Sequence, residues 1–196
     1  MAMEIKRPEP HIRRPDHAKI VHHGQIFDVY QWEQELYDGT IATFESLKRP
    51  DTVEVIPVLP DGDILLVEQQ QPQTKPYLSL VAGRMEAGEE PLSSMRRELL
   101  EETGYEAEKW ELWSAFQPVH KIDWTVFTFI AKGLKKSAEQ NLDAGEKIEL
   151  KSLSLENFLE VIGRTELLVG PALIQAIEAR ASDAKKEQLR KLFGIS

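Results

Sequence analysis

Residues 83–105 read GRMEAGEEPLSSMRRELLEETGY, and over this segment the chain changes from a strand-like pattern to a helical one. Pro91 suits the first position of a helix, and Gly104 suits the position just past its end. Together they predict a helix over residues 91–103. Two glycines precede this helix, in a loop where glycine would let the backbone approach a ligand closely.

The predicted helix carries carboxylates where a stable helix would not place them. At about 100° per residue, Met95 and Leu99 share the core face, and Glu98 and Glu102 lie one turn apart along its border. Acidic runs on helices are usually solvated faces. Here, however, like charges one turn apart cost roughly 0.2–0.5 kcal/mol, and each carboxylate near the C-terminus opposes the helix dipole by roughly 0.3–1 kcal/mol. Such a cluster of hard oxygen ligands favours Mg²⁺, with Mn²⁺ as a possible substitute.

The composition limits the class of protein. The chain has 196 residues, of which 41% are hydrophobic and 29% are charged, enough for one well-cored domain with or without an appended arm. No segment approaches the roughly 18 consecutive apolar residues of a membrane-spanning helix, and the polar, proline-rich N-terminus is unlike a secretory signal. The chain has no cysteine, which excludes disulfides, thiolate metal sites and a cysteine nucleophile. We therefore expect a cytoplasmic protein without a membrane partner.

The net charge of −9 disfavours nucleic acid as a partner, because an acidic surface repels the phosphate backbone. A small phosphorylated molecule remains compatible with this charge if divalent cations supply the local positive charge. The expected partner is therefore a small-molecule substrate.

Outside the central segment, strands outnumber helices. The Asp38-Gly39 and Pro60-Asp61-Gly62 turns predict two hairpins, and mixed strands and helices predict an α/β sandwich. The break at Arg49-Pro50-Asp51 divides a strand-rich arm, residues 1–50, from a main domain, residues 51–196. Residues 1–17 look like a loose, partly basic lead-in. Further strands are predicted at 77–83, 110–115, 124–131 and 147–153, and further helices at 155–162 and 171–181, followed by a charged tail.

The central segment resembles the Nudix box of the Nudix hydrolase family. Every specified position matches, and the chance of such a match is below roughly one in a million at average amino-acid usage. The resemblance implies an α/β/α sandwich with a mixed β-sheet and, here, an N-terminal β-strand arm. The matching positions are Gly83, Glu89, Arg97-Glu98-Leu99, Glu101-Glu102 and Gly104-Tyr105.

The resemblance also implies an activity. Nudix hydrolases cleave a nucleoside diphosphate linked to another moiety, with two or three Mg²⁺ and a water that the metals activate. By position, Glu98 and Glu102 would be metal ligands, together with the backbone carbonyl of Ala82, and Glu101 would add a contact to the metal or its waters. Arg97 would pair with Glu89 and so fix the loop against the helix.

Beyond the box, the chain is similar to the ADP-ribose pyrophosphatase branch. It shares with that branch the strand arm, a glutamine-rich segment after residues 64–67, Leu-Val-Ala-Gly before the box and the acidic stretch 143–149. In that branch, the arm exchanges between the subunits of a homodimer and its aromatic residues help to hold the adenine, which implies Tyr30 and Trp32 here. The acidic loop supplies a further metal-directed carboxylate and the general base, which implies Glu146, with Glu98 as the alternative base.

Several positions keep two interpretations. Tyr30 and Trp32 could stack on a base, or they could pack in the core or an interface. His120, Lys121 and Asp123 lie in a loop that could contact the substrate or could simply be solvated. Gln71 stands where the branch often has a substrate-contacting arginine, and Ser79, Val81 and Ala144 also depart from the branch pattern.

We predict a Mg²⁺-dependent pyrophosphatase that splits an ADP-ribose-like or nucleotide-sugar substrate into a nucleoside monophosphate and a phosphorylated remainder. One alternative is an enzyme that removes damaged nucleoside triphosphates, although such enzymes are often shorter and lack an arm. The other is a nucleotide-sensing Nudix module without hydrolysis, which usually has an eroded box.

Overall fold

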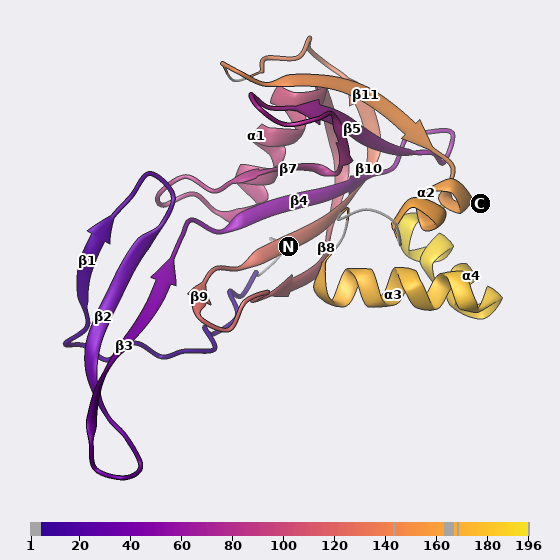
Figure 1. Ribbon diagram of the computed structural model, residues 1–196. Helices are drawn as coiled ribbons and strands as arrows, with labels where there is room; N and C mark the ends of the chain where they lie inside the picture. The colour runs from indigo at the N-terminus through magenta and orange to yellow at the C-terminus, as the bar shows by residue number, and fades with distance from the viewer. Residues whose placement is uncertain (1–4, 143, 163–166, 168, 196) are drawn as a thin grey trace.

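The computed structural model describes residues 5–142, 144–162, 167 and 169–195, and its N-terminal part is a projecting β-sheet (Figure 1). The strands β1 (Lys19–His23), β2 (Asp28–Glu35) and β3 (Ile41–Lys48) form an antiparallel meander. The short strand β9 (Ile122–Asp123) comes from the main body and pairs with β3 in parallel. One sheet therefore joins the arm to the loop that contains His120 and Asp123.

Two further sheets form the main body. The first has the order β7-β4-β10-β8, and the second has the order β11-β5-β6. Because β4 is parallel to β10 while β7 and β8 are antiparallel to their neighbours, the first sheet is mixed, as predicted. The strands are β4 (Thr52–Pro57), β5 (Ile64–Gln70), β6 (Tyr77–Ser79), β7 (Val81–Arg84), β8 (Tyr105–Phe116), β10 (Val126–Lys136) and β11 (Lys147–Leu153).

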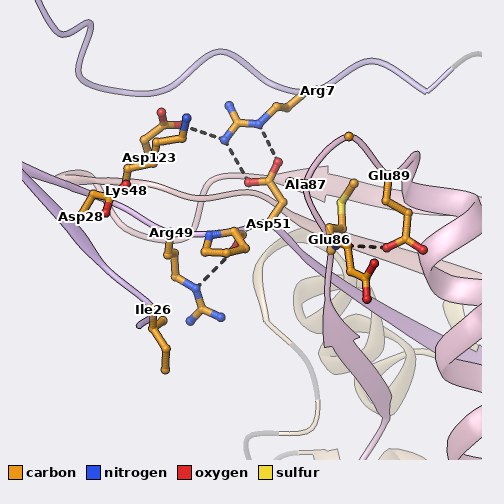
Figure 2. A pocket seen from close by; sticks show the side chains of 13 residues that line it. Arg7, Ile26, Asp28, Lys48, Arg49, Asp51, Glu86, Ala87, Glu89 and Asp123 are labelled. Atoms are coloured by element: carbon orange, nitrogen blue, oxygen red, sulfur yellow. Dashed lines mark hydrogen bonds and ion pairs between the residues drawn. The ribbon is translucent and has the colours of Figure 1, made fainter. Parts of the chain in front are cut away.

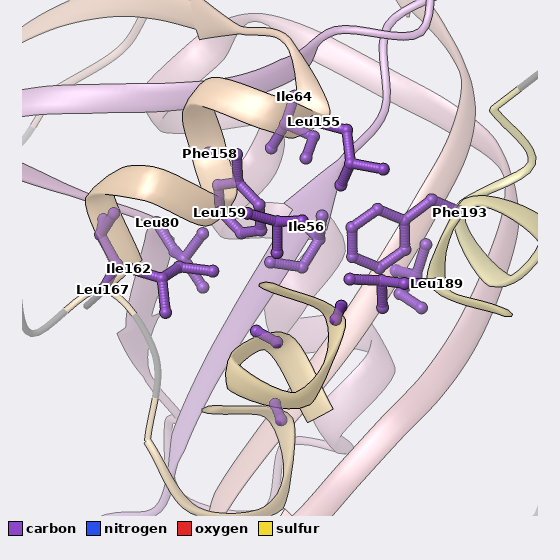
Figure 3. Close-up of a cluster of buried hydrophobic side chains, with 14 of the residues drawn as sticks. Ile56, Ile64, Leu80, Leu155, Phe158, Leu159, Ile162, Leu167, Leu189 and Phe193 are labelled. Carbon is purple, nitrogen blue, oxygen red and sulfur yellow. The ribbon is translucent and has the colours of Figure 1, made fainter. Parts of the chain in front are cut away.

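Helices cover both sides of these strands (Figure 1). On one side, α1 (Pro91–Thr103) shares a buried cluster with Val53 and Val55 of β4. On the other side, Ile56 joins a second cluster with α2 (Leu155–Ile162), α3 (Gly170–Ala181) and α4 (Asp183–Phe193) (Figure 3). Side chains alternate along a strand, so β4 contributes to both clusters. This arrangement confirms the α/β/α sandwich. Within the described ranges, no helix is long and apolar enough to span a membrane.

The structure corrects two predicted elements. The strand predicted over residues 77–83 is interrupted at Leu80, so that β6 and β7 belong to different sheets. The predicted charged tail folds as α4. Ser182 caps its first turn, and Leu189 and Phe193 are buried against the main body. The sequence of α4 is mostly charged, so Leu189 and Phe193 alone did not give a recognisable apolar face.

Residues 5–17 also differ from the loose lead-in that the sequence predicts, and we call them the N-terminal strap. Arg7 donates hydrogen bonds to both carboxylate oxygens of Asp51, at 2.7 and 2.9 Å, and to Asp123 at 2.7 Å. Arg14 donates to the second oxygen of Asp123 at 2.6 Å and lies 4.1 Å from the centre of the Tyr30 ring. The strap therefore ties the arm sheet to the main body.

A buried carboxyl group lies inside the first sheet of the main body. Glu54 on β4 is only 8% exposed and accepts a hydrogen bond of 2.7 Å from Thr128, which in turn accepts one from Ser114. Burial raises the pKa of Glu54 to about 7, although the bond from Thr128 opposes the shift. The folded protein therefore holds a proton on Glu54 at pH values where the unfolded chain releases it.

Replacing Glu54 with glutamine is expected to change how stability depends on pH. Below the unfolded pKa of 4.5 both states are protonated, whereas between pH 4.5 and about 7 only the folded state is, so the free energy of unfolding falls as pH rises. The shift corresponds to about 3 kcal/mol. Glu54→Gln should therefore melt several degrees higher than the wild type near pH 8 and at a similar temperature near pH 4. Thermal melts against pH test this, with Glu160→Gln on the exposed face of α2 as control; a parallel offset at every pH would contradict it.

Candidate functional site

The C-terminal half of α1 places the predicted carboxylates beside β7. Gly104 ends the helix in the left-handed conformation, with a φ of 70°, and its N–H donates to the carbonyl of Leu100 at 2.7 Å. The Glu98 carboxyl group lies directly against Gly83, where an added Cβ atom would overlap it. Burial raises the pKa of Glu98, although Arg97 opposes the shift. Glycine at position 83 therefore leaves the space that the Glu98 carboxylate occupies.

Arg97 is the cation at the centre of this cluster. Its guanidinium donates to both oxygens of Glu89, at 3.2 and 3.1 Å, to Glu98 at 2.9 Å and to Glu101 at 3.1 Å. The guanidinium of Arg97 lowers the pKa of Glu89. The pairing of Arg97 with Glu89 thus holds the loop before α1 against the helix. One guanidinium cannot neutralise three carboxylates, so the cluster keeps an excess of negative charge.

Glu102 is a buried carboxylate with one unpartnered oxygen among the described residues. Its side chain is 7% exposed, and its Oε2 atom has no hydrogen-bond partner among the described residues. Burial, followed by the nearby charges of Glu98 and Glu146, raises its pKa to about 9. A buried carboxylate without a full set of partners costs free energy unless a cation or proton compensates it.

Glu146 reaches the same cluster from a distant part of the chain. It directly precedes β11, whose first residue, Lys147, pairs with Gln70 at the end of β5. Its charge raises the pKa of both Glu98 and Glu102, which places it near both carboxylates. Asp143, from the same acidic stretch, lies outside the described residues.

Sequence reasoning missed Tyr77, which also lies near these groups. Burial raises the pKa of its phenol, and the charges of Glu102 and Glu146 raise it further. Tyr77 begins β6 and is 44% exposed. An aromatic residue in a short predicted strand gives no sign that its strand will turn toward the end of α1.

The residues at the end of α1 fit a hard divalent cation. The side-chain donors are all carboxylate oxygens, and the Oε2 atom of Glu102 lacks a partner in the described part of the chain. No three acidic or histidine side chains of that part already converge on one point, and Glu98 instead contacts Arg97. The donor chemistry therefore suits Mg²⁺ or Mn²⁺, while the Arg97 guanidinium partly neutralises the carboxylates.

The predicted aromatic residues of the arm are largely covered. Trp32 is 6% exposed, and its ring centre lies 6.0 Å from that of Phe44. Tyr30 is half-buried beneath the guanidinium of Arg14. In this arrangement, both aromatic residues contribute to packing within the arm and against the strap.

The predicted loop residues lie in different surroundings. His120 stacks on His11 of the strap, with 4.8 Å between the ring centres. Lys121 is exposed, and its backbone carbonyl accepts a hydrogen bond from Leu47 of β3. Gln71 is exposed one residue beyond the Gln70–Lys147 pair, so it lies near Glu146. Of these three residues, the structure brings only Gln71 close to the carboxylate cluster.

A cavity of about 590 Å³ lies between the arm and the loop before α1 (Figure 2). Arg49 and Asp51 line one side, and residues 85–89 line the other. Glu89 in this wall is held by Arg97, which also contacts Glu98. A single guanidinium thus links the cavity wall to the carboxylate cluster.

Comparison with known proteins agrees with this geometry. The family model of the NUDIX domain matches residues 48–168, which include α1, the loop before it and Glu146. The chain belongs to the Nudix family. The matched residues include the Nudix box predicted from the sequence, residues 83–105. The predicted fold and the predicted class of enzyme, a Nudix hydrolase, are confirmed.

Two curated relatives cover most of this chain. ADP-ribose pyrophosphatase of Bacillus subtilis (strain 168) is 34% identical over 147 residues, which span 74% of this chain and 80% of the relative. The methanol dehydrogenase activator of Bacillus methanolicus is 30% identical over 168 residues, which span 84% of this chain and 91% of the relative. A crystal structure described as an ADP compounds hydrolase matches with a TM-score of 0.69 over the full length of both chains, at 16% identity. At that identity, the structural likeness shows the fold alone.

Proposed function

We propose that this Nudix hydrolase cleaves the diphosphate of ADP-ribose or a related nucleotide sugar. Water attacks one phosphorus, the bond to the bridging oxygen breaks, and the products are a nucleoside monophosphate and a phosphorylated remainder. The observation that carries the proposal is the buried Glu102, whose Oε2 atom lacks a partner among the described residues, beside Glu98 at Gly83. The relative named ADP-ribose pyrophosphatase supports the choice of substrate.

The carboxylates are proposed to hold Mg²⁺ through Glu98, Glu102, Glu146 and the backbone carbonyl of Ala82, with Glu101 adding a contact. When bound, Mg²⁺ supplies positive charge for the diphosphate and makes an attacking water more acidic. One guanidinium, that of Arg97, pairs with Glu89, Glu98 and Glu101. Because one positive charge cannot balance three negative ones, the remaining negative charge supports the binding of a metal cation.

Glu146 is proposed to accept the proton from the attacking water, with Glu98 as the alternative. Glu146 lies just before β11, outside the helix, and its charge acts on both predicted ligands of α1. Arg97 acts by positioning, since it fixes the loop before α1 through Glu89. Gln71, one residue beyond β5, is the first candidate among the predicted substrate contacts, because it lies near Glu146. Tyr30, Trp32, His120 and Lys121 are further candidates.

A substrate panel tests the proposed reaction. The protein is incubated with Mg²⁺ and ADP-ribose, nucleotide sugars, dinucleotides or nucleoside triphosphates, and the release of monophosphate is followed. We expect turnover of ADP-ribose or a nucleotide sugar. Turnover of triphosphates alone would instead identify the triphosphate-removing enzyme, and no turnover of any compound would identify a sensing module.

We also propose that residues 1–50 mediate a homodimer. The arm exposes apolar side chains on strands that project from the main body (Figure 1), among them Ile20, which is 52% exposed, Ile41, at 61%, and Phe44, at 39%. The strand β1 is also an open edge of its sheet. Exposed apolar surface on a projecting sheet is typical of a subunit interface.

Ile20→Glu is expected to halve the mass of the particle in solution, because a charge would be buried in the interface. Size-exclusion chromatography with light scattering measures this. Ile174→Glu on α3 is a matched control, since Ile174 is 59% exposed and lies outside the arm. A wild-type monomer, or equal masses for both variants, would contradict the dimer.

A further inference from the structure

The cavity between the arm and the loop before α1 is lined by basic side chains that form no ion pair within the described residues. Lys48 and Arg49 line it, and Arg84 lies beside Arg49. Within the described residues, none of these three side chains forms an ion pair, whereas Arg7 in the same wall pairs with Asp51 and Asp123 (Figure 2). Three basic side chains without an ion pair in the described part of the chain therefore lie around one cavity, while the charges of Asp51 and Asp123 act on Arg49 and Lys48 from a longer distance.

Arg49 is held by aromatic rings instead of by carboxylates. Its guanidinium lies 4.4 Å from the centre of the Trp124 ring and 5.7 Å from that of Phe27. Its hydrogen bonds to the carbonyl of Pro50 and the hydroxyl of Thr52 are both long, at 3.4 Å. Stacking fixes the plane of a guanidinium and leaves its N–H edge available for an anion.

Arg84 adds a second positive charge at the same place. It faces Thr52 across the β4–β7 pair, and Thr52 is also the residue that Arg49 contacts. Burial lowers the pKa of Arg49, and the charge of Arg84 lowers it further, although the charge of Asp51 opposes the shift. Repulsion between the two cations opposes folding, in the same way as repulsion between the carboxylates at the end of α1.

Most acidic residues of the cavity wall are already occupied. Asp51 and Asp123 pair with strap arginines, and Glu89 pairs with Arg97. Asp28 is hydrogen-bonded to His23, and the side chain of Glu86 is exposed. The charge that remains unbalanced around Arg49 is therefore mainly positive.

We propose that this cavity binds a phosphate monoester, with Arg49 as the principal donor and Lys48 and Arg84 as supporting charges. The planar guanidinium presents paired N–H groups that match two phosphate oxygens. A cavity of about 590 Å³ is large enough for a nucleotide-sized group. The phosphate can belong to either of two molecules. It can be attached to the ribose of a diphosphate substrate, which rests on the proposed function, or it can belong to a separate small effector.

Binding is tested on the metal-free full chain, in which the carboxylate cluster repels anions. Inorganic phosphate and adenosine 2′-monophosphate are titrated by calorimetry and by tryptophan fluorescence, because Trp124 lies against Arg49. We expect saturable binding that weakens about tenfold or more in Arg49→Gln and is unchanged in Arg180→Gln, at the exposed end of α3. If Arg49→Gln does not fold, Lys48→Gln replaces it in the test. Lys48 is exposed, and this variant should weaken binding several-fold. Absence of saturable binding, or equal affinity in the folded cavity variants, would overturn the site.

Turnover then identifies the source of the phosphate. ADP-ribose is compared with ADP-ribose that carries a ribose 2′-phosphate, both with Mg²⁺. If the substrate carries the phosphate, the wild type should have a higher kcat/KM for the phosphorylated compound than for ADP-ribose. In Arg49→Gln, the ratio of these two kcat/KM values should be near one. A separate effector predicts equal kcat/KM values and a change in ADP-ribose turnover when adenosine 2′-monophosphate is added. If no diphosphate is hydrolysed, the proposed function fails while the binding result stands.

Discussion

Glu102→Gln is expected to lower kcat by about 100-fold or more and to raise the melting temperature of the metal-free protein. The activity falls because a neutral amide is a poorer ligand for Mg²⁺ than a carboxylate. The stability rises because the buried Glu102 carboxyl has a pKa of about 9, owing first to burial and then to Glu98 and Glu146. Between pH 4.5 and about 9, the folded state alone keeps the proton, so the free energy of unfolding falls as pH rises.

Monophosphate release and thermal melts measure these two effects. In a chelating buffer, both proteins should lose some stability up to about pH 7 through Glu54, and between pH 7 and pH 8.5 the wild type should go on losing stability while Glu102→Gln should change little. Added Mg²⁺ should stabilise the wild type but not the variant. Glu106→Gln, which removes an exposed carboxylate just beyond the helix, is the control. A large fall in the melting temperature of Glu102→Gln would mean that the carboxylate cluster serves architecture instead of metal binding.

The helix of the box was predictable from the sequence because its signals are local. Pro91 and Gly104 mark its ends, and the observed helix runs from Pro91 to Thr103, as predicted. The spacing of Met95 and Leu99 gave the buried face, and both side chains have no exposed surface. Steric rules for proline and glycine act within a few residues, so no knowledge of the rest of the fold was needed.

The elements that sequence analysis missed depend on distant contacts. The break at Leu80 arises because β6 pairs with β5 while β7 pairs with β4. The helix α4 is held by Phe193, whose ring lies 5.4 Å from that of Trp113. The strap is held by ion pairs across 44 and 116 residues, from Arg7 to Asp51 and Asp123. None of these partners lies within the window that a local pattern covers.

The candidate site divides in the same way. The pairing of Arg97 with Glu89 and the nearness of Glu98 to Glu102 follow from helix spacing and the box. Tyr77 and Arg49 carry no motif, and only the packing of β6 and of the arm brings them to the cluster and the cavity. Local sequence therefore defined the charged centre of the site, while its surroundings depend on tertiary structure.

Gly83→Ala is expected to lower kcat by about 100-fold or more while it changes the free energy of unfolding by less than about 1 kcal/mol. An added Cβ atom would overlap the Glu98 carboxyl group, so this side chain would have to turn away from β7. The overlap involves the end of a flexible side chain, and the residue pairs with Val53 in an ordinary antiparallel ladder. The backbone of the fold can therefore stay as it is, whereas the carboxylate oxygens of Glu98 have to move.

Two further variants separate this steric effect from a general loss of backbone freedom. Gly62 lies in the β4–β5 turn with a φ of 91°, so Gly62→Ala should lose about 1 kcal/mol of stability and keep its kcat. Glu98→Asp shortens the acidic side chain by one methylene, so Gly83→Ala should cost less activity in that background than in the wild type. Steady-state kinetics and chemical denaturation measure both quantities. If Gly83→Ala kept full activity, or lost it equally in both backgrounds, the space beside Gly83 would not be what fixes the Glu98 carboxylate for metal binding.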